Sequence, residues 1–238
     1  MKITKELLKE KGACAAGYRD FLKEYPVDKY PDGVEYQELL DCCAEKNFSY
    51  GSWLLGVFGR TYEVRKIDGD LIGERGIIFA GRLEVKGRIK AGLGIEAGLG
   101  IKAGLGIEAG LGIKAGLGIE AGCGIKAGLG IEAGLGIKAG EGIEAGWGIK
   151  AGWGIEAGLG IKAGLGIEAG LGIKAGEGIE AGLGIEAGRG IEAGCEYGIY
   201  AGLRCRITNK TLRKIIAKKR PENIMCGEFE EKKDDAVR

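Results

Sequence analysis

The sequence predicts a mainly β protein, a triangular β-solenoid with three six-residue units per coil, a small α-helical domain before it and an irregular C-terminal cap after it. Two observations carry this prediction. The phrase AGxGI(E/K) repeats without interruption from residue 91 to residue 192, and its last letter alternates between glutamate and lysine along most of that length. A short fixed period of this kind is typical of solenoid and repeat architectures.

The glycine spacing of the repeat excludes both an α-helix and a collagen triple helix. Two glycines per hexad cost a helix about 2 kcal/mol relative to alanine, and collagen needs glycine at every third residue. Here the glycines are spaced two and four residues apart. A β-solenoid remains, in which each hexad forms one short strand and one corner, and coils stack about 4.8 Å apart. Glycine is expected to supply the backbone angles of the corners.

The charge alternation predicts three hexads per coil. Two hexads per coil would stack Glu96 on Glu108, and directly opposed like charges are unfavourable. Three hexads stack Glu96 on Lys114 and give three ladders of alternating sign. The alternation breaks where Glu186 follows Glu168, and Arg189 lies near it in sequence as a compensating charge. Exposed pairs contribute about 0 to 1 kcal/mol each, so the ladders specify register while burial of isoleucine and alanine drives folding.

The same frame extends backwards through degenerate hexads to Ile67. Residues 67–192 would therefore make about seven coils, about 30 Å tall at 4.8 Å per coil. Residues 193–238 contain a two-residue insertion and irregular sequence. We interpret them as a closing coil and tail, because an open solenoid end exposes unpaired strand groups.

The orientation of the variable x position has two interpretations. Strict alternation along a strand would point x inward, and the leucines would then fill the interior. We favour a partly exposed corner position, because x also accepts Glu141, Glu177, Arg189 and tryptophan. Two of the three edges would then be apolar, as interaction surfaces often are. The predicted interaction edges are Leu93, Leu111, Leu129, Trp147, Trp153, Leu165 and Leu183.

Residues 1–58 predict three or four short helices. Thr4 is placed to cap the first helix and Gly12 to end it. This module is expected to seal the first coil or to carry a partner-binding face. We expect Cys14, Cys42 and Cys43 to be buried small hydrophobic residues, since the chain has no histidine to activate a thiol.

The net charge limits the classes of partner that the chain is expected to bind. Thirty-five basic and 34 acidic residues give a net charge of +1, so no global field favours nucleic acid or an anionic membrane. One segment near the C-terminus is locally basic, which marks either a contact for an acidic partner or a solvated edge of the closing coil. Its basic residues are Arg204, Arg206, Lys210, Arg213, Lys214, Lys218, Lys219 and Arg220.

Seven cysteines without a CxxC pair, in a chain without histidine, suggest neither a disulfide framework nor a zinc site. We expect no cofactor and a reducing compartment. No signal peptide or membrane-spanning run is visible, so a soluble cytoplasmic protein is expected.

Two resemblances follow from the residues. The pattern "GRLEVKGRIKAGLGIEAG" resembles the triangular β-helix of bactofilin-type cytoskeletal proteins, although the helical module departs from that family. The layout "LLKEKGAC..G...F" with "YQELLDCC....N....WLL..FG", followed by a solenoid, is similar to phage and prophage repeat proteins. The second resemblance implies a viral or mobile-element origin and the cytoplasm of a bacterial host, and it implies no agreed activity.

The expected function is non-enzymatic. Hexapeptide solenoids that are acyltransferases or carbonic anhydrases depend on histidine as base or metal ligand, which this chain lacks. We expect a structural or scaffolding protein that forms homo-oligomers through its Leu/Trp edges or its ends. The alternative is a phage or mobile-element protein that binds a host protein such as a defence component.

Overall fold

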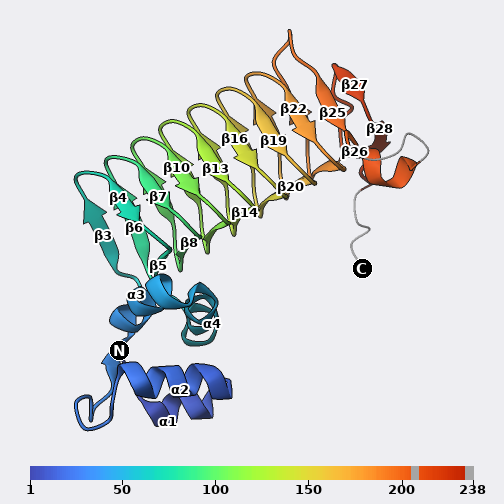
Figure 1. Cartoon of the computed structure of the whole chain (residues 1–238). Helices are drawn as coiled ribbons and strands as arrows, with labels where there is room; N and C mark the ends of the chain where they lie inside the picture. Colours follow the sequence, from blue (N-terminus) through green and yellow to red (C-terminus); the bar gives the residue numbers. More distant parts are fainter. Residues whose placement is uncertain (205–208, 234–238) are drawn as a thin grey trace.

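The computed structural model describes residues 1–204 and 209–233. It is a parallel β-solenoid of about nine turns, with about 18 residues and three strands in each turn. A small group of helices hangs from the N-terminal end of the solenoid, so the molecule has the outline of an L (Figure 1). The predicted fold class and the three hexads per coil are therefore confirmed.

Three parallel sheets run the length of the solenoid, and we name each after one central strand. The β16 sheet consists of β4 (Leu71–Gly73), β7 (Ile89–Ala91), β10 (Ile107–Ala109), β13 (Ile125–Ala127), β16 (Ile143–Ala145), β19 (Ile161–Ala163), β22 (Ile179–Ala181), β25 (Ile199–Ala201) and β27 (Ile224–Cys226). The β17 sheet consists of β5 (Ile77–Phe79), β8 (Ile95–Ala97), β11 (Ile113–Ala115), β14 (Ile131–Ala133), β17 (Ile149–Ala151), β20 (Ile167–Ala169), β23 (Ile185–Ala187), β26 (Lys214–Ala217) and β28 (Glu228–Glu231). The β15 sheet consists of β3 (Val64–Ile67), β6 (Arg82–Val85), β9 (Ile101–Ala103), β12 (Ile119–Ala121), β15 (Ile137–Ala139), β18 (Ile155–Ala157), β21 (Ile173–Ala175) and β24 (Ile191–Glu192).

The stacked strands extend beyond the predicted repeat region at both ends. Seven coils are expected for residues 67–192, but strands already pair from Val64, and β25 to β28 add further rungs after residue 192. The C-terminal segment thus continues the parallel ladders despite its irregular sequence, with a 3₁₀ helix η1 (Lys210–Arg213) before β26.

The charge ladders follow the predicted register. Glu96 lies beside Lys114 in the β17 sheet, and Lys150 pairs with Glu168 at 3.0 Å. Where Glu168 lies beside Glu186, the compensating charge is Lys232, whose Nζ is 2.7 Å from Glu186 Oε1. The expected compensation by Arg189 is wrong, because Lys232, which follows β28, forms the ion pair with Glu186.

Isoleucine and alanine fill the core. Each repeat strand presents its Ile and Ala to the interior with at most 4% of the residue exposed, and its Glu or Lys to the outside. Fully burying one isoleucine side chain contributes about 1.5–3 kcal/mol. The sum over the stacked columns, rather than the ladders, stabilises the solenoid.

The repeat glycines are needed for close approach, which corrects the expectation that they supply special backbone angles. None of the glycines from Gly92 to Gly198 has a positive φ. A Cβ on the first glycine of a hexad, such as Gly134, would instead overlap the carbonyl oxygen of Gly116 in the preceding turn. A Cβ on the second glycine, such as Gly136, would lie 3.4 Å from the carbonyl oxygen of Gly154, a close contact without overlap.

The N-terminal module contains four helices and a small antiparallel ribbon. Its elements are β1 (Lys2–Ile3), α1 (Lys5–Glu10), α2 (Ala15–Glu24), β2 (Val34–Glu35), α3 (Tyr36–Lys46) and α4 (Phe48–Phe58). Thr4 caps α1 as expected, since its Oγ1 accepts a hydrogen bond from the Leu7 N–H at 3.2 Å, and Gly12 follows α1 with φ 78°.

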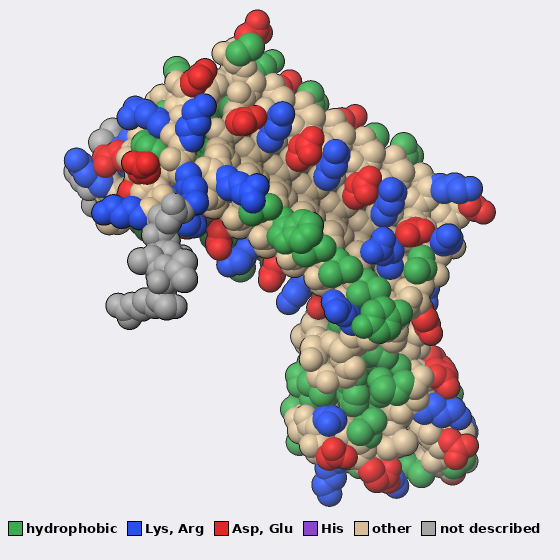
Figure 2. All heavy atoms as spheres, turned by 180° about the vertical axis from the view of Figure 1, so that it is seen from behind, with side chains coloured by type: hydrophobic (Ala, Val, Ile, Leu, Met, Phe, Trp, Pro, Cys, Tyr) green, Lys and Arg blue, Asp and Glu red, His purple; other side chains and the backbone are tan. Residues whose placement is uncertain are grey.

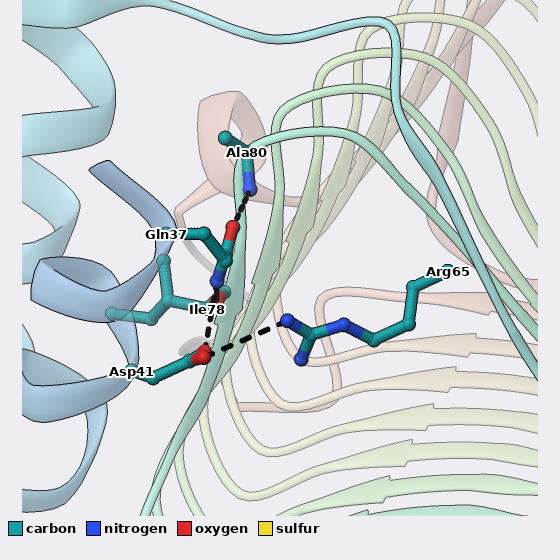
Figure 3. A network of polar contacts seen from close by, with 5 residues as sticks. All are labelled: Gln37, Asp41, Arg65, Ile78 and Ala80. Carbon is teal, nitrogen blue, oxygen red and sulfur yellow. Dashed lines mark hydrogen bonds and ion pairs between the residues drawn. The ribbon is translucent and has the colours of Figure 1, made fainter. Parts of the chain in front are cut away.

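Helix α3 closes the free edge of β5. The Gln37 amide donates to the Ile78 carbonyl at 2.8 Å and accepts from the Ala80 N–H at 3.0 Å, as a neighbouring strand would (Figure 3). Ile78 occupies the outward position of its strand, in line with Glu96, and is buried in the core of the module. The module therefore covers both an edge and the outer face of the first turns of the β17 sheet.

An arginine lies over a phenylalanine at each end of the solenoid. Arg65 stands beside the buried Leu83 in the ladder, and its guanidinium lies 4.6 Å from the Phe79 ring centroid and 3.5 Å from Asp41 of α3. At the other end Phe229 packs against the core, 5.8 Å from the Arg220 guanidinium. A charged group over the end of a core discourages the addition of another strand layer.

Candidate interaction surface

The variable x residues lie at the three corners of the solenoid, outside its core. Corner I joins the β16 and β17 sheets and carries Leu93, Leu111, Leu129, Trp147, Leu165 and Leu183. Corner II joins the β17 and β15 sheets and carries Leu99, Leu117, Leu135, Trp153, Leu171 and Arg189. Corner III joins the β15 and β16 sheets and carries Leu105, Cys123, Glu141, Leu159, Glu177 and Cys195.

The exposure of these residues agrees with the corner interpretation. Trp147 and Trp153 are 57% and 56% exposed. Among the other x residues, Leu105, Leu111, Leu159 and Leu165 are exposed, Leu99 is buried, and the remaining leucines are half-buried. The strict alternation of a strand ends at each corner because the G-x-G turn reorients the chain, so x does not follow Ile and Ala into the core.

The outer face of the β17 sheet is partly covered. Ser52 of α4 donates a 2.5 Å hydrogen bond to Glu96, which is 8% exposed, and Phe48 lies against Gly76 and Gly94. The rest of this face forms a shallow groove of about 790 Å³ that runs from Phe48 to Thr211 and Lys214 near η1. Trp147 and Leu129 form part of its wall.

The outer face of the β15 sheet carries the longest regular ladder. Its outward residues alternate in sign over eight rungs: Lys66, Glu84, Lys102, Glu120, Lys138, Glu156, Lys174 and Glu192. Corner II gives it one strongly exposed apolar side chain, Trp153, and corner III, which it shares with the β16 sheet, gives it Leu105 and Leu159. Alternating rows of lysine and glutamate are visible along the back of the solenoid, with a line of hydrophobic side chains on one edge that leads toward the helical module (Figure 2).

The outer face of the β16 sheet combines charge with exposed apolar side chains on both sides. Its ladder has six alternating rungs: Lys90, Glu108, Lys126, Glu144, Lys162 and Glu180. Corner I, whose Trp147 and Leu165 also line the groove of the β17 sheet, borders it with exposed Leu111, Trp147 and Leu165, and corner III borders it with exposed Leu105 and Leu159. The groove between corner III and the ladder has a volume of about 920 Å³.

Apolar residues also end this ladder. Ile72 takes the outward position before Lys90 and is 64% exposed, and Tyr200 takes the position after Glu180. We call the ladder, these two residues and the bordering residues of corners I and III the β16 face. Most of the strongly exposed apolar side chains of the described repeat region border this face, with Trp153 as the main exception.

The residues of the predicted basic patch do not form one continuous positive surface, because two of its lysines pair with glutamates. Lys210 lies 3.9 Å from Glu228, and Lys214 pairs with Glu230. Arg204 lies along corner I beside Gly164 and Gly182, while Arg213 packs against Gly202. Lys218 and Lys219 are exposed, Arg220 lies over Phe229, and Arg206 lies outside the described residues.

The module's cysteines differ from expectation in one case. Cys14 is exposed rather than buried, and its Sγ caps α2 by accepting a hydrogen bond from the Gly17 N–H at 3.3 Å. Cys42 and Cys43 are half-buried, and burial raises the pKa of the Cys43 thiol to about 12. They line a cleft of about 420 Å³ between the two helix pairs, together with Tyr25 and Trp53.

Within residues 1–204 and 209–233, no cluster of three or more Cys, Asp and Glu side chains is arranged to hold a metal ion. No helix in the same part of the chain has the length and apolar character needed to cross a membrane. Comparison with protein-family models, curated proteins and solved structures finds no match. The solenoid agrees with the fold that both resemblances imply, without assigning the chain to either group.

Sequence reasoning missed half of the β16 face. Ile72 and Tyr200 are absent from the predicted edges because they stand where the repeat is degenerate. Leu105 and Leu159 share their corner with Glu141 and Glu177, so the predicted apolar edges do not include them. The 18-residue register contained the signal, since it places these two leucines on one corner with a ladder beside them.

Proposed function

We propose that this chain is a non-enzymatic structural or scaffolding protein whose solenoid associates laterally with copies of itself. The observation that supports this most is the exposure of apolar side chains along corner I, with Trp147 at its middle. Exposed apolar rows of this length are unusual in monomers and mark association surfaces. The regular backbone beneath them holds each side chain at a fixed spacing along a rigid rod.

The expectation that the ends mediate assembly finds less support than the edges. Gln37 occupies hydrogen-bonding groups of the β5 edge, and Arg65 and Arg220 lie over the ends of the core. A further solenoid stacking on these ends would have to displace charged groups. Lateral association leaves both ends unchanged.

A bacterial cytoplasm, with a phage or mobile-element origin, belongs to the same proposal. The six cysteines of the described residues are all free, as is usual in a reducing compartment. The origin rests on the resemblance of residues 1–58 and the repeat to phage and prophage proteins.

The test is light scattering coupled to size-exclusion chromatography over a concentration series. We expect the wild-type protein to be a dimer or larger and the double variant Trp147→Glu, Trp153→Glu to become monomeric while keeping its β-type circular dichroism. A wild type that is monomeric at every concentration would overturn the proposal. Loss of the circular dichroism signal would assign the tryptophans to the core.

A second candidate function is the binding of a host protein. The supporting observation is the groove on the β17 sheet, which is bounded by the helical module at one end and by Thr211 and Lys214 at the other. A photo-crosslinking residue at Glu132, in the floor of this groove, would then capture one host protein, and the same residue at Glu120 on the β15 sheet would not. Equal capture at both positions would contradict this candidate.

A further inference from the structure

The β16 face has a sequence of charges that is complementary to itself when read backwards. Along its ladder the signs run plus, minus, plus, minus, plus, minus from Lys90 to Glu180. Reading the same six rungs from the other end gives the opposite sign at every position. A second copy in antiparallel orientation therefore matches the whole ladder.

Symmetry separates this arrangement from the parallel one. In a closed two-fold dimer the same surface meets itself. A two-fold axis along the solenoid would place each lysine of the ladder against the same lysine of the second copy, which is unfavourable. An axis across the solenoid, between β13 and β16, places Lys126 against Glu144 of the second copy and reverses every sign.

The apolar residues of the face match in the same arrangement. With the axis between β13 and β16, each residue meets the one that lies equally far on the other side. Leu111 then meets Leu165, Leu105 meets Leu159, and Leu129 meets Trp147 of the second copy. At the ends of the ladder, Ile72 meets Tyr200. Each of these apolar side chains thus meets another apolar side chain.

Trp147 stands next to the proposed axis. It follows β16, the fifth of the nine strands of its sheet, so the two copies of Trp147 would lie on either side of the centre of the contact. Large aromatic residues near the centre of an interface usually dominate its binding energy. The helical module does not obstruct this face, because it packs on the β17 sheet.

We propose that two copies of this chain associate in antiparallel orientation through their β16 faces, with a two-fold axis between β13 and β16. This inference rests on the proposed self-association and adds its face, its orientation and its register. The ladder supplies the register, because shifting one copy by a single turn opposes like charges. Corner I borders the ladder with leucine and tryptophan side chains, whereas corner III contributes Leu105 and Leu159 with Cys123 and Glu141 between them.

The first test compares two single tryptophan variants. Trp147→Glu places a carboxylate beside the axis and should weaken the dimer by about thirtyfold or more. Trp153→Glu is the matched control, since it is equally exposed but lies on corner II, and should leave dimerisation unchanged. If Trp153→Glu alone dissociates the dimer, the face is wrong although self-association stands.

The second test inverts the ladder. Six substitutions exchange every charge on the β16 face while keeping the mass, the net charge and the alternation within the chain. They are Lys90→Glu, Glu108→Lys, Lys126→Glu, Glu144→Lys, Lys162→Glu and Glu180→Lys. Each protein alone should dimerise, because inverting both partners keeps opposite signs opposed, but wild type and inverted protein should not form mixed dimers.

Native mass spectrometry measures the fraction of mixed dimers after wild type is mixed with the ¹⁵N-labelled inverted protein. The control inverts all eight charges of the β15 ladder from Lys66 to Glu192, and this variant should mix with wild type in statistical proportion. Statistical mixing of the β16-inverted protein would overturn the antiparallel arrangement. A wild type without any dimer would overturn the proposed function and the inference together.

Discussion

The solenoid and the helical module are held together in contrasting ways. The solenoid repeats one contact set, Ile on Ile and Ala on Ala, and each turn contacts its two neighbours. The module depends on contacts that occur once, such as the Tyr36 hydroxyl, which donates to the carbonyl oxygens of Leu54 and Gly59 at 3.3 and 3.0 Å. A single substitution should therefore act locally in the solenoid and throughout the module.

Burial and charge follow the same contrast. The Tyr36 pKa is raised, chiefly because the phenol is buried in the module. In the solenoid the charged side chains stay outside, where the hydrogen bond that Lys150 donates to Glu168 raises the pKa of Lys150. The module is therefore stabilised by specific buried polar contacts. The solenoid is stabilised by a repeated apolar column and keeps its charged side chains in solvent.

The largest effect is expected in the core of the module. Leu40 is fully buried, so Leu40→Ala should destabilise the module by about 2–5 kcal/mol through a cavity. The helical signal in circular dichroism should then melt at a lower temperature while the β signal keeps its wild-type Tm. Val27→Ala, at an exposed position of the module, is the control and should change neither transition. A joint shift of both signals would show that the two regions unfold as one unit.

The two glycines of one hexad should differ in their tolerance of alanine. Gly134→Ala forces a methyl group into the Gly116 carbonyl and should cost about 1–3 kcal/mol. Gly136→Ala has room and should be neutral or stabilise by about 0.4–1 kcal/mol, because it restricts the unfolded chain. Urea denaturation of both variants measures the difference. Equal destabilisation would contradict the close-approach explanation.

The contact between the two regions should have a smaller effect. Gln37→Ala removes two hydrogen bonds to the β5 edge and should cost about 1–2 kcal/mol, at about 1 kcal/mol for each bond. Hydrogen exchange should increase at the Ala80 amide, whose N–H loses its acceptor. Glu38→Ala, on the exposed side of the same helix, is the control. Unchanged protection at Ala80 would mean that Gln37 does not hold the module to the solenoid.

The smallest effect concerns reactivity rather than stability. Burial raises the pKa of Cys43 to about 12, so at pH 8 its thiol stays protonated and should react far more slowly with a thiol reagent than the exposed Cys14. Mass spectrometry of peptides after brief labelling gives the order of reaction. In denaturant the two should react at similar rates. Faster labelling of Cys43 in the folded protein would contradict its burial.

The sequence by itself determined the solenoid, its three strands per turn and its register. It could do so because the period of six, the two glycines and the alternating charge all constrain the same backbone spacing. Thr4 was also predictable, since an N-cap depends on a hydrogen bond between residues three apart. Of the candidate surface, corner I was readable from the 18-residue register.

The tertiary structure alone decided what depends on contacts between distant segments. It brought Lys232 to Glu186, Gln37 to the β5 edge, and Arg65 over Phe79. It also decided why the glycines are needed, because the obstacle to a Cβ is a carbonyl oxygen 18 residues earlier. Local sequence cannot contain that contact, and for the same physical reason Ile72 and Tyr200 joined the β16 face only when the turns were stacked.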